Sequence, residues 1–442
     1  MTVSATAVND KTILRPRPRV GIVCDFREEE WPSMELVADM LLARLRDDYP
    51  EVIDAAMIRP EMRIRFAKRE SEASNHDPQK SWGWRLGANG KAFNADRVLN
   101  RFWDYPRYVR RARSEFDLFH IIDHSYGQLL HVLPPERTII TCHDLDTFQC
   151  LLRPADEPRS IFFKKMMSRT LSGFRRAARV TCVSSATRDE LLRYRLIASD
   201  RVVVIPNGVH PSFRPEADAV SDARARTLIG DSQGYMNILH VGSTIPRKRI
   251  DVLLRVVAGL RDLFPQVRLL RVGGALNSEQ RTLAKNLQLA GSILELPRLD
   301  EKVLAAIYRC AAVVLQPSER EGFGLPVVEA MACGTPVVAS DLPVLREVGG
   351  DAAVFCEMGN IQSWVKEVAE LLNERTRHAE RWSQRREAGF KQSAKFTWSE
   401  YSRRMVDVYR SVLHSCQVHA ETPDRHTKVA SNQETGTESA FI

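Results

Sequence analysis

The sequence contains no apolar run that approaches the ~18 residues of a membrane span, and residues 1–18 lack the apolar core of a secretory signal peptide. No two of the eight cysteines are spaced as C-x2-C, the pattern typical of zinc sites. Several lie in apolar stretches such as VGIVC and RVTCVS, which indicates buried thiols in a reducing compartment. These absences predict a cytoplasmic protein that is either free or rests on the inner face of a membrane. The cysteines are Cys24, Cys142, Cys150, Cys182, Cys310, Cys333, Cys356 and Cys416.

The excess of positive charge is small and is concentrated in the first half of the chain. The formal net charge is +8, and residues 1–207 hold 34 Lys and Arg against 28 Asp and Glu, a difference of +6. Such a balance suits an anionic membrane surface or a lipid-phosphate acceptor, and nucleic acid could also exploit it. A solvated basic surface without a partner is the alternative. Because no nucleic-acid-binding signature is present, we expect no nucleic-acid partner.

The length and composition predict two ordinary globular domains. At 442 residues the chain exceeds the ~250–300 residues at which a single core stops growing. Its hydrophobic content of 44% is that of a folded globular protein, which argues against a fibre or a disordered chain.

The most informative stretch is AVVLQPSEREGFGLPVVEAMACGTPVVAS, residues 312–340. The apolar run at 312–316 predicts a buried strand, and a loop with two glycines follows at 319–324. Pro326 suits the first turn of a helix, which Gly334 would end. Together these elements predict an anion site, because free N–H groups and the positive end of the helix dipole converge there.

Two carboxylates bracket this predicted anion site. Glu321 lies in the loop and Glu329 eight residues later in the helix. Carboxylates repel phosphate, so they are better suited to accept hydrogen bonds from neutral hydroxyl groups. A diphosphate flanked by hydroxyl-bearing groups describes a nucleotide sugar. The alternative is that both are solvated surface charges.

The spacing E-x7-E within EGFGLPVVEAMACGTPVVAS resembles the signature of retaining GT-B glycosyltransferases of family 4. The resemblance implies an α/β fold of the GT-B class, with two Rossmann-like domains facing a cleft and a C-terminal helix that crosses back to the N-terminal domain. It also implies that Glu329 holds the ribose hydroxyls and Glu321 the hydroxyls of the donor sugar. The loop and the helix start would surround the nucleotide sugar with Gly322, Phe323, Gly324 and Leu325.

The same resemblance divides the chain into domains. IPNGV at 205–209 matches the family's crossing point between the domains, and residues 211–235 show little apolar pattern, which predicts a linker or mobile loop. The expected units are a loose leader at 1–18, an N-terminal acceptor-side domain at 19–207, a C-terminal nucleotide-sugar-binding domain at 208–396, a helix at 397–414 that returns to the first domain, and a disordered tail at 417–442.

In the N-terminal half, polar residues directly follow two predicted strands. The strand at 118–122 runs into Asp123 and His124, and the strand at 138–142 runs into His143. Because ligands of open parallel sheets bind beyond the carboxyl ends of the strands, we expect both clusters in the cleft. His143 resembles the family's cleft histidine near the reacting centre, and a hydrogen-bonded core histidine is the alternative.

Three further features concern the N-terminal half. The first predicted strand is followed by DFREEEWPSM and not by the glycine-rich loop of many family members. Trp82 and Trp84 could stack on a sugar or lie at a membrane interface, but packing under a surface loop is favoured. A metal site built from His120, Asp123, His124 and His143 is the least favoured option, since the spacing of a helical metal site is missing.

A basic turn follows the first predicted strand of the C-terminal half. In GSTIPRKR, Gly242 and Ser243 allow close approach to phosphate, and Arg247 and Lys248 supply positive charge. This resembles the family's phosphate-binding Arg/Lys pair, although many members carry the arginine at the position of Ser243. A solvated basic turn is the alternative. The expected contacts with the base are Leu296 and Leu299.

The sequence thus predicts a retaining glycosyltransferase that moves a hexose from a nucleotide sugar (GDP-mannose or a UDP-sugar) to a glycan or lipid-linked acceptor in polysaccharide biosynthesis. Arg247, Lys248 and the helix dipole would stabilise the departing diphosphate without a metal, so no cofactor is expected beyond the donor itself. Two alternatives stay open. One is a sugar-nucleotide 2-epimerase on the same scaffold, which needs no acceptor, and the other is a non-enzymatic basic protein that binds surfaces.

Overall fold

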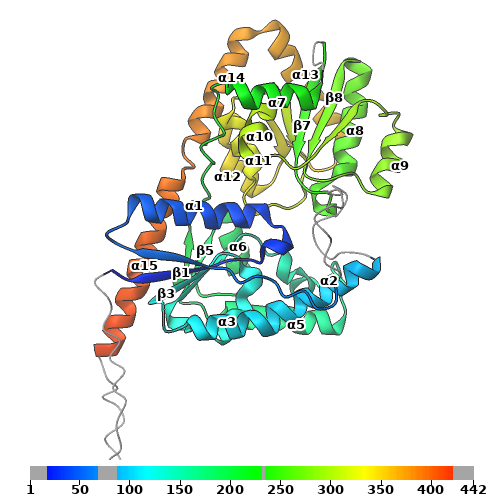
Figure 1. Ribbon diagram of the computed structural model, residues 1–442. Coiled ribbons are helices and arrows are strands. Elements are labelled where there is room, and N and C mark those ends of the chain that lie inside the picture. The colour runs from blue at the N-terminus through cyan, green and yellow to red at the C-terminus, as the bar shows by residue number, and fades with distance from the viewer. Residues whose placement is uncertain (1–16, 68–86, 231–233, 422–442) are drawn as a thin grey trace, which may run out of the picture.

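The computed structural model describes residues 17–67, 87–230 and 234–421. Trp82 and Trp84, most of the leader and most of the predicted tail therefore lie outside the described residues. Figure 1 shows two lobes, with the first half of the chain in the lower lobe and the second half in the upper one.

The lower lobe is built on a parallel sheet of six strands in the order β2-β1-β3-β4-β5-β6. Its strands β3 and β4 are buried along their whole length, as expected where helices cover both faces of a parallel sheet. The strands are β1 (Arg19–Val23), β2 (Asp54–Ile58), β3 (Leu118–Ile121), β4 (Thr138–Cys142), β5 (Arg179–Cys182) and β6 (Val202–Val204), and the helices are α1 (Pro32–Asp48), α2 (Gly87–Leu99), α3 (Tyr105–Ala112), α4 (Gln149–Leu152), α5 (Ile161–Phe174) and α6 (Ser185–Arg193).

The upper lobe repeats this plan with the strand order β12-β11-β10-β7-β8-β9. The predicted fold of two Rossmann-like halves is confirmed. The strands are β7 (Met236–Val241), β8 (Val267–Val272), β9 (Ile293–Leu296), β10 (Val313–Gln316), β11 (Val337–Ser340) and β12 (Val354–Cys356), and the helices are α7 (Ala219–Ile229), α8 (Ile250–Leu263), α9 (Ser278–Asn286), α10 (Glu301–Cys310), α11 (Leu325–Ala332), α12 (Pro343–Gly349), α13 (Ile361–Arg377) and α14 (Ala379–Ser393).

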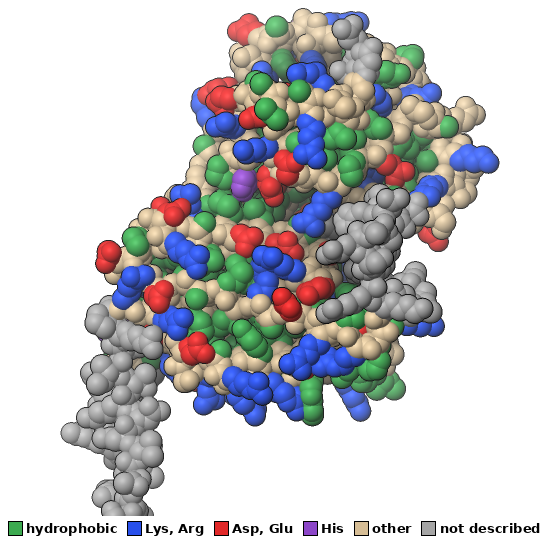
Figure 2. Space-filling view, in the orientation of Figure 1, with side chains coloured by type: hydrophobic (Ala, Val, Ile, Leu, Met, Phe, Trp, Pro, Cys, Tyr) green, Lys and Arg blue, Asp and Glu red, His purple; other side chains and the backbone are tan. Residues whose placement is uncertain are grey.

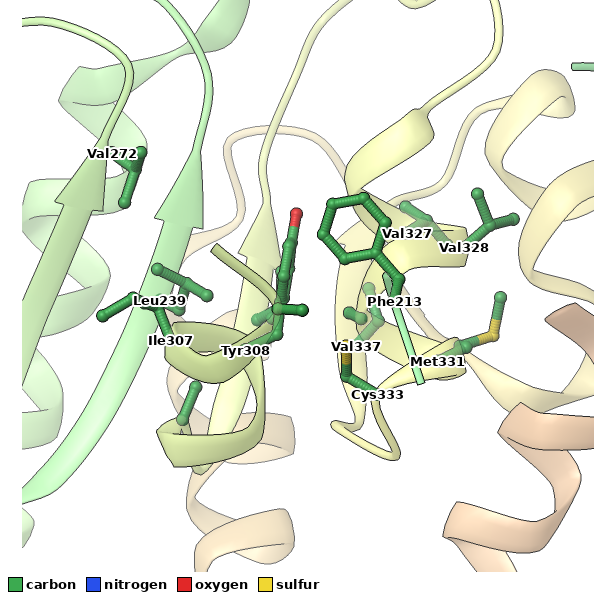
Figure 3. Close-up of a cluster of buried hydrophobic side chains, with 14 of the residues drawn as sticks. Phe213, Leu239, Val272, Ile307, Tyr308, Val327, Val328, Met331, Cys333 and Val337 are labelled. Atoms are coloured by element: carbon green, nitrogen blue, oxygen red, sulfur yellow. The ribbon is translucent and has the colours of Figure 1, made fainter. Parts of the chain in front are cut away.

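The core of the upper lobe holds the functional loops in place. Figure 3 shows Phe213, Tyr308 and Val327 packed together below the carboxyl ends of the strands. The rings of Phe213 and Tyr308 meet edge to face at 5.7 Å. All three side chains are almost fully removed from water, which anchors helices α10 and α11 against the sheet.

The prediction of a linker at 211–235 is wrong for residues 219–229, which form helix α7. The side chain of Asp218 caps this helix by accepting a hydrogen bond of 2.8 Å from the N–H of Ser221. Ser221, Ala225 and Ile229 are the buried residues, spaced four apart along one face. Of these three residues only Ile229 is large and apolar, so the stripe gives little apolar signal and the helix is hard to recognise in the sequence.

The final helix, α15 (Trp398–Glu421), crosses back to the lower lobe as predicted. Trp398, Tyr401 and Met405 pack in the same core as strands β1 and β3. The hydroxyl of Tyr409 lies 2.8 Å from Nδ1 of the buried His120. The helix ends at Glu421, so the prediction of disorder is wrong for residues 417–421.

The chain passes between the lobes twice, and the two passages lie side by side. The N–H of Val209 donates to the carbonyl of Phe396 at 3.0 Å. Gly208 packs so closely on the second passage that an added Cβ atom would lie 2.4 Å from the backbone nitrogen of Trp398. The predicted crossing at IPNG therefore sits against the start of the returning helix.

Within the described part of the chain, no helix combines the length and the apolar character that crossing a bilayer would require.

Candidate functional site

Two loops at the carboxyl edge of the upper sheet form the centre of the site. One follows β7 and contains a short helical turn, Pro246–Lys248, and the other connects β10 to α11. Since β7 and β10 are neighbours in the sheet, their loops emerge together. The N–H of Glu319 donates to the carbonyl of Arg247 at 2.8 Å and ties one loop to the other.

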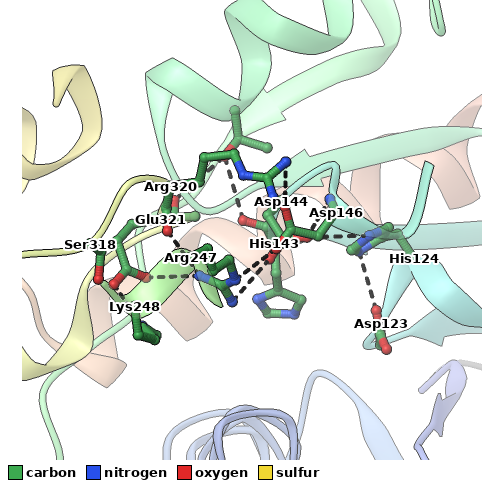
Figure 4. Close-up of polar contacts among 12 residues, drawn as sticks. Asp123, His124, His143, Asp144, Asp146, Arg247, Lys248, Ser318, Arg320 and Glu321 are labelled. Atoms are coloured by element: carbon green, nitrogen blue, oxygen red, sulfur yellow. Dashed lines mark hydrogen bonds and ion pairs between the residues drawn. The ribbon is translucent and has the colours of Figure 1, made fainter. Parts of the chain in front are cut away.

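A buried carboxylate joins the two predicted cations. Nζ of Lys248 lies 2.6 Å from Oε1 of Glu321, and Nη1 of Arg247 lies 3.4 Å from Oε2 of the same residue. The amide of Gln316 also donates to Oε1. Figure 4 shows Lys248, Ser318 and Glu321 grouped in this way, with Arg247 extending from them toward the lower lobe. We call Arg247, Lys248 and Glu321 the charged triad.

The charges of the triad depend on one another. Burial alone would raise the pKa of Glu321, but Lys248 and Arg247 lower it to about 2. Burial likewise lowers the pKa of Lys248, and the attraction of Glu321 opposes that change. Glu321 stays ionised at neutral pH and pairs with both cations. This pairing offsets the free energy needed to remove Lys248 and Arg247 from water. With two positive charges and one negative charge, the triad has a net charge of +1.

Helix α11 begins directly after the triad. Gly324 precedes its first residue and adopts a left-handed backbone conformation, φ = 96°, which glycine reaches without steric cost. Leu325 and Pro326 form the first turn, as the sequence predicts. The first N–H groups of a helix have no partner within the helix, so this terminus presents donors and a positive dipole end at the loop that carries Glu321.

The second glutamate of the E-x7-E pair lies within helix α11. Glu329 is buried, and its Oε2 accepts a hydrogen bond of 2.8 Å from the hydroxyl of Tyr308 on α10. Burial raises its pKa to about 7, and the hydrogen bond from Tyr308 opposes this shift without cancelling it. Glu321 and Glu329 therefore differ in charge near neutral pH, although they share one motif.

His143 lies in the cleft between the lobes, next to the triad. Its Nε2 is 2.8 Å from the carbonyl oxygen of Ile122, which can only accept, so Nε2 carries the proton and Nδ1 has a free lone pair. Burial lowers its pKa, which keeps the imidazole neutral at pH 7. Gly322 packs against its backbone: an added Cβ atom would lie 1.8 Å from the His143 carbonyl oxygen.

Acidic residues after β4 reach across the cleft to the triad. Nε of Arg247 lies 2.7 Å from Oδ2 of Asp146, and its Nη2 lies 3.9 Å from Asp144. Burial and the neighbouring Asp144 raise the pKa of Asp146 to about 6. His124 is held between Asp123 at 3.2 Å and Asp144 at 3.7 Å, so a chain of charged groups runs from the lower lobe into the triad (Figure 4).

A second set of contacts closes the lobes beside the site. The hydroxyl of Ser184 donates to the carbonyl of Gly322 at 2.8 Å. The carboxylate of Glu347 on α12 accepts hydrogen bonds from the N–H of Ser185 at 2.9 Å and from that of Ala186 at 3.4 Å. A carboxylate of the upper lobe therefore satisfies the first turn of α6 in the lower lobe.

Other predicted residues occupy different environments. Leu296 is buried in the core of the upper lobe, and Leu299 packs against that core. The ring of Phe323 is also buried and meets Phe396 at 5.5 Å, so only its backbone is available to a ligand. The carbonyl of Gly242 accepts from Arg271 at 3.0 Å, and Ser243 is half-buried beside it.

Several functional candidates were not singled out from the sequence. Asp146 and Arg320 lie in the cleft, where they are 3.7 Å apart. Their signal is local, because HDLD directly follows a strand and Arg320 lies inside the EREGFG loop.

His120 is a core residue bonded to Tyr409 and Thr141, and its pKa is lowered by burial to about 3. In the described parts of the chain, no three His, Cys, Asp or Glu side chains are grouped as metal ligands would be.

Comparison with known proteins identifies similar sequences and folds. The family model described as "Glycosyl transferases group 1" matches residues 229–388, and that described as "Glycosyltransferase Family 4" matches residues 69–213. The chain is 26% identical over 390 residues to the O-antigen chain mannosyltransferase B of Escherichia coli, which covers 86% of this chain and 94% of that protein.

Solved structures agree with the fold. The sucrose-phosphate synthase of Thermosynechococcus elongatus superposes with a TM-score of 0.68 at 18% identity, over 90% of this chain and all of that one. Anabaena Alr3699/HepE in complex with UDP and glucose superposes with a TM-score of 0.66 at 16% identity, over 89% of this chain and all of that one.

The raised pKa of Glu329 predicts a pH-dependent stability. The folded state favours the neutral form of Glu329. The contribution of this group to the free energy of unfolding is therefore fully present below the ordinary pKa of about 4.3 and is lost as the pH rises through about 7. Glu329→Gln keeps an acceptor for Tyr308 but cannot ionise. Its free energy of unfolding relative to wild type should therefore rise by about 3 kcal/mol between pH 4.5 and pH 8.

Urea unfolding at both pH values measures this difference. Glu370→Gln, on the exposed face of α13, is the matched control and should show no such trend. An equal response of the two variants would contradict the assignment of the raised pKa to Glu329.

Proposed function

We propose that this chain, which belongs to the group 1 glycosyltransferases of family 4, transfers a hexose from a nucleotide sugar with retention of configuration and without a resident metal. It is a glycosyltransferase with the GT-B fold. The observation that carries the finer proposal is the charged triad beside the N-terminus of α11, at the edge where the ligands of parallel sheets bind.

The triad suits the diphosphate of the donor. Breaking the bond between the sugar and the diphosphate places negative charge on the leaving group, and preorganised donors stabilise that charge. Lys248 has three N–H groups, of which one faces Glu321. The diphosphate would be contacted by the other two N–H groups of Lys248, by the guanidinium of Arg247 and by the N–H groups at the start of α11.

The two glutamates suit the hydroxyl groups on either side of the diphosphate. Oε1 of Glu321 accepts from Lys248 and Gln316, and Ser318 is a further hydrogen-bond partner of this carboxylate. Oε2, which lies 3.4 Å from Nη1 of Arg247, can accept from a donor-sugar hydroxyl. Glu329 would hold the ribose hydroxyls. Hydrogen bonds from two ribose hydroxyls favour the ionised form of the Glu329 carboxylate. Binding of the nucleotide sugar should therefore lower the pKa of Glu329 and release a proton below pH 7.

In the reaction, the bond between the anomeric carbon and the diphosphate oxygen breaks, and a bond from the anomeric carbon to the acceptor oxygen forms. With retention, the acceptor attacks from the face that the diphosphate leaves. The acceptor proton passes to the departing phosphate oxygen, so no second carboxylate is required. The neutral His143, whose Nδ1 has a free lone pair, can orient a hydroxyl group in this part of the cleft.

The donor is proposed to be GDP-mannose or a UDP-sugar. One relative that is matched over 94% of its length is a mannosyltransferase, and a structural neighbour was solved with UDP and glucose. The acceptor is proposed to be a glycan or a lipid-linked sugar. The alternative of a 2-epimerase is tested by product analysis with the donor alone, because an epimerase would convert the donor in the absence of any acceptor.

Lys248→Ala should lower kcat/KM by at least a hundredfold, because it removes a donor that stabilises the leaving diphosphate. The measurement is release of nucleoside diphosphate from GDP-mannose or UDP-glucose, together with the melting temperature. Lys366→Ala is the matched control, an exposed lysine of the same lobe, and should leave activity unchanged. Near-normal activity of Lys248→Ala would rule out its role at the diphosphate.

The proposed chemistry needs no metal, because two cations and a helix terminus replace it. Transfer activity should survive dialysis against EDTA within a factor of two. Loss of activity on chelation, restored by Mg²⁺ or Mn²⁺, would contradict this part of the proposal while leaving the glycosyltransferase assignment intact.

We also propose that the lower lobe rests on an anionic membrane surface. Figure 2 shows Lys and Arg side chains along the lower edge of the view, where α3 and α5 lie. Arg107, Arg110 and Arg111 are exposed on α3. Trp103, which precedes this helix, is 58% exposed, and Cζ of Arg107 lies 3.2 Å from the centre of its ring. Exposed tryptophan beside basic residues is typical of a membrane interface.

The double variant Arg110→Glu/Arg111→Glu should bind vesicles containing anionic lipid at least tenfold more weakly than wild type, because each basic residue near such a surface contributes about 1 kcal/mol. Vesicle sedimentation measures the effect. The control is Arg375→Glu/Arg377→Glu at the end of α13 in the other lobe, which changes the net charge equally. Equal weakening by the two double variants would indicate a response to net charge and not a specific face.

A further inference from the structure

The lower lobe contains an apolar groove that opens into the cleft. The groove lies between α2 and the start of α5 and has a volume of about 780 Å³, within the range of small-molecule sites. Val98, Leu99, Phe162, Phe163 and Met166 form its apolar walls. Phe162 remains 65% exposed, an unfavourable state for a large apolar side chain.

The groove is continuous with the catalytic cleft. Val98, Arg159, Phe163 and Met166 line both cavities, and the cleft extends from them to His143 and Arg247. A molecule that fills the groove can therefore also reach the triad.

The junction of the two cavities carries positive charge. Arg159 lines both spaces, and its guanidinium lies 5.6 Å from the ring centre of Phe163 and 3.7 Å from a carboxylate oxygen of Glu157. Arg97 and Arg101 line the cleft next to this junction and are paired with the buried Glu29. Lys91 also lines the groove. An apolar chamber with a cationic mouth fits an anionic head group attached to a hydrocarbon chain.

We propose that this groove binds the hydrocarbon chain of a lipid-linked acceptor, with the acceptor's phosphate groups at the junction near Arg159 and its sugar in the cleft. This inference rests on the proposed function and narrows its acceptor to one class, a sugar joined through phosphate to a lipid. It assigns Phe162 and Leu99 to recognition of the hydrocarbon chain. This role is distinct from the proposed contact of α3 with a membrane surface.

The chain offers a matched pair of variants. Phe162→Asp places a charge in the groove wall, and both it and Ile161→Asp change residues at the start of α5 that are already largely exposed. Ile161 is 76% exposed and does not line the groove. A general effect of apolar surface would affect both variants, whereas occupation of the groove affects Phe162→Asp alone.

The experiment compares a C20 prenyl diphosphate with a C5 prenyl diphosphate by calorimetry, in the presence of saturating UDP or GDP to occupy the donor site. Wild type and Ile161→Asp should bind the C20 compound at least tenfold more tightly than the C5 compound. Phe162→Asp should lose this preference and keep its melting temperature.

Equal affinity of wild type for both compounds, or the same loss in both variants, would overturn the proposal. Affinity for UDP or GDP is measured separately in each variant and should not change. Failure of nucleotide binding would count against the proposed function, whereas loss of the chain-length preference alone would count against the groove.

Discussion

The site depends on the burial of one carboxylate between two cations. Without Glu321, Lys248 and Arg247 would be held at the edge of a buried sheet with little compensation, and burial would favour their displacement into water. With it, a net positive group is held in a fixed position by two loops that emerge from adjacent strands. Positive charge that is already ordered before a ligand arrives requires no further reorganisation when negative charge develops.

The triad also determines how the two lobes meet. Arg247 belongs to the upper lobe, yet its closest ion pair is with Asp146 of the lower one. Glu347 makes the reverse connection by accepting from the first turn of α6. Gly322 makes a third contact between the lobes, because its carbonyl accepts from Ser184 and it has no room for a side chain against the His143 carbonyl. A side chain at position 322 would therefore prevent the lobes from closing as they do.

The sequence predicts the strands and the placement of functional loops at their carboxyl ends, because both follow from local patterns of apolar and polar residues. It does not reveal that Glu321 pairs with Lys248, since the two residues lie 73 positions apart and meet only through the order of the strands. Nor does the sequence show which loop residues face the cleft with their side chains and which with their backbone alone. Phe323 lies in the predicted loop, but its ring is buried against Phe396. Helix α7 is missed because its buried stripe, Ser221, Ala225 and Ile229, contains a single large apolar residue.

The contact between Phe323 and Phe396 has a mechanical consequence. Phe396 is part of the second passage between the lobes, where its carbonyl is bonded to Val209 of the first passage. Because the two passages are adjacent, they define a single axis about which the lobes can turn. Phe396 lies on that axis, and its ring meets Phe323 of the loop between β10 and α11 at 5.5 Å. Rotation of one lobe about this axis therefore displaces the loop before α11, so that opening of the cleft and movement of this loop become one motion.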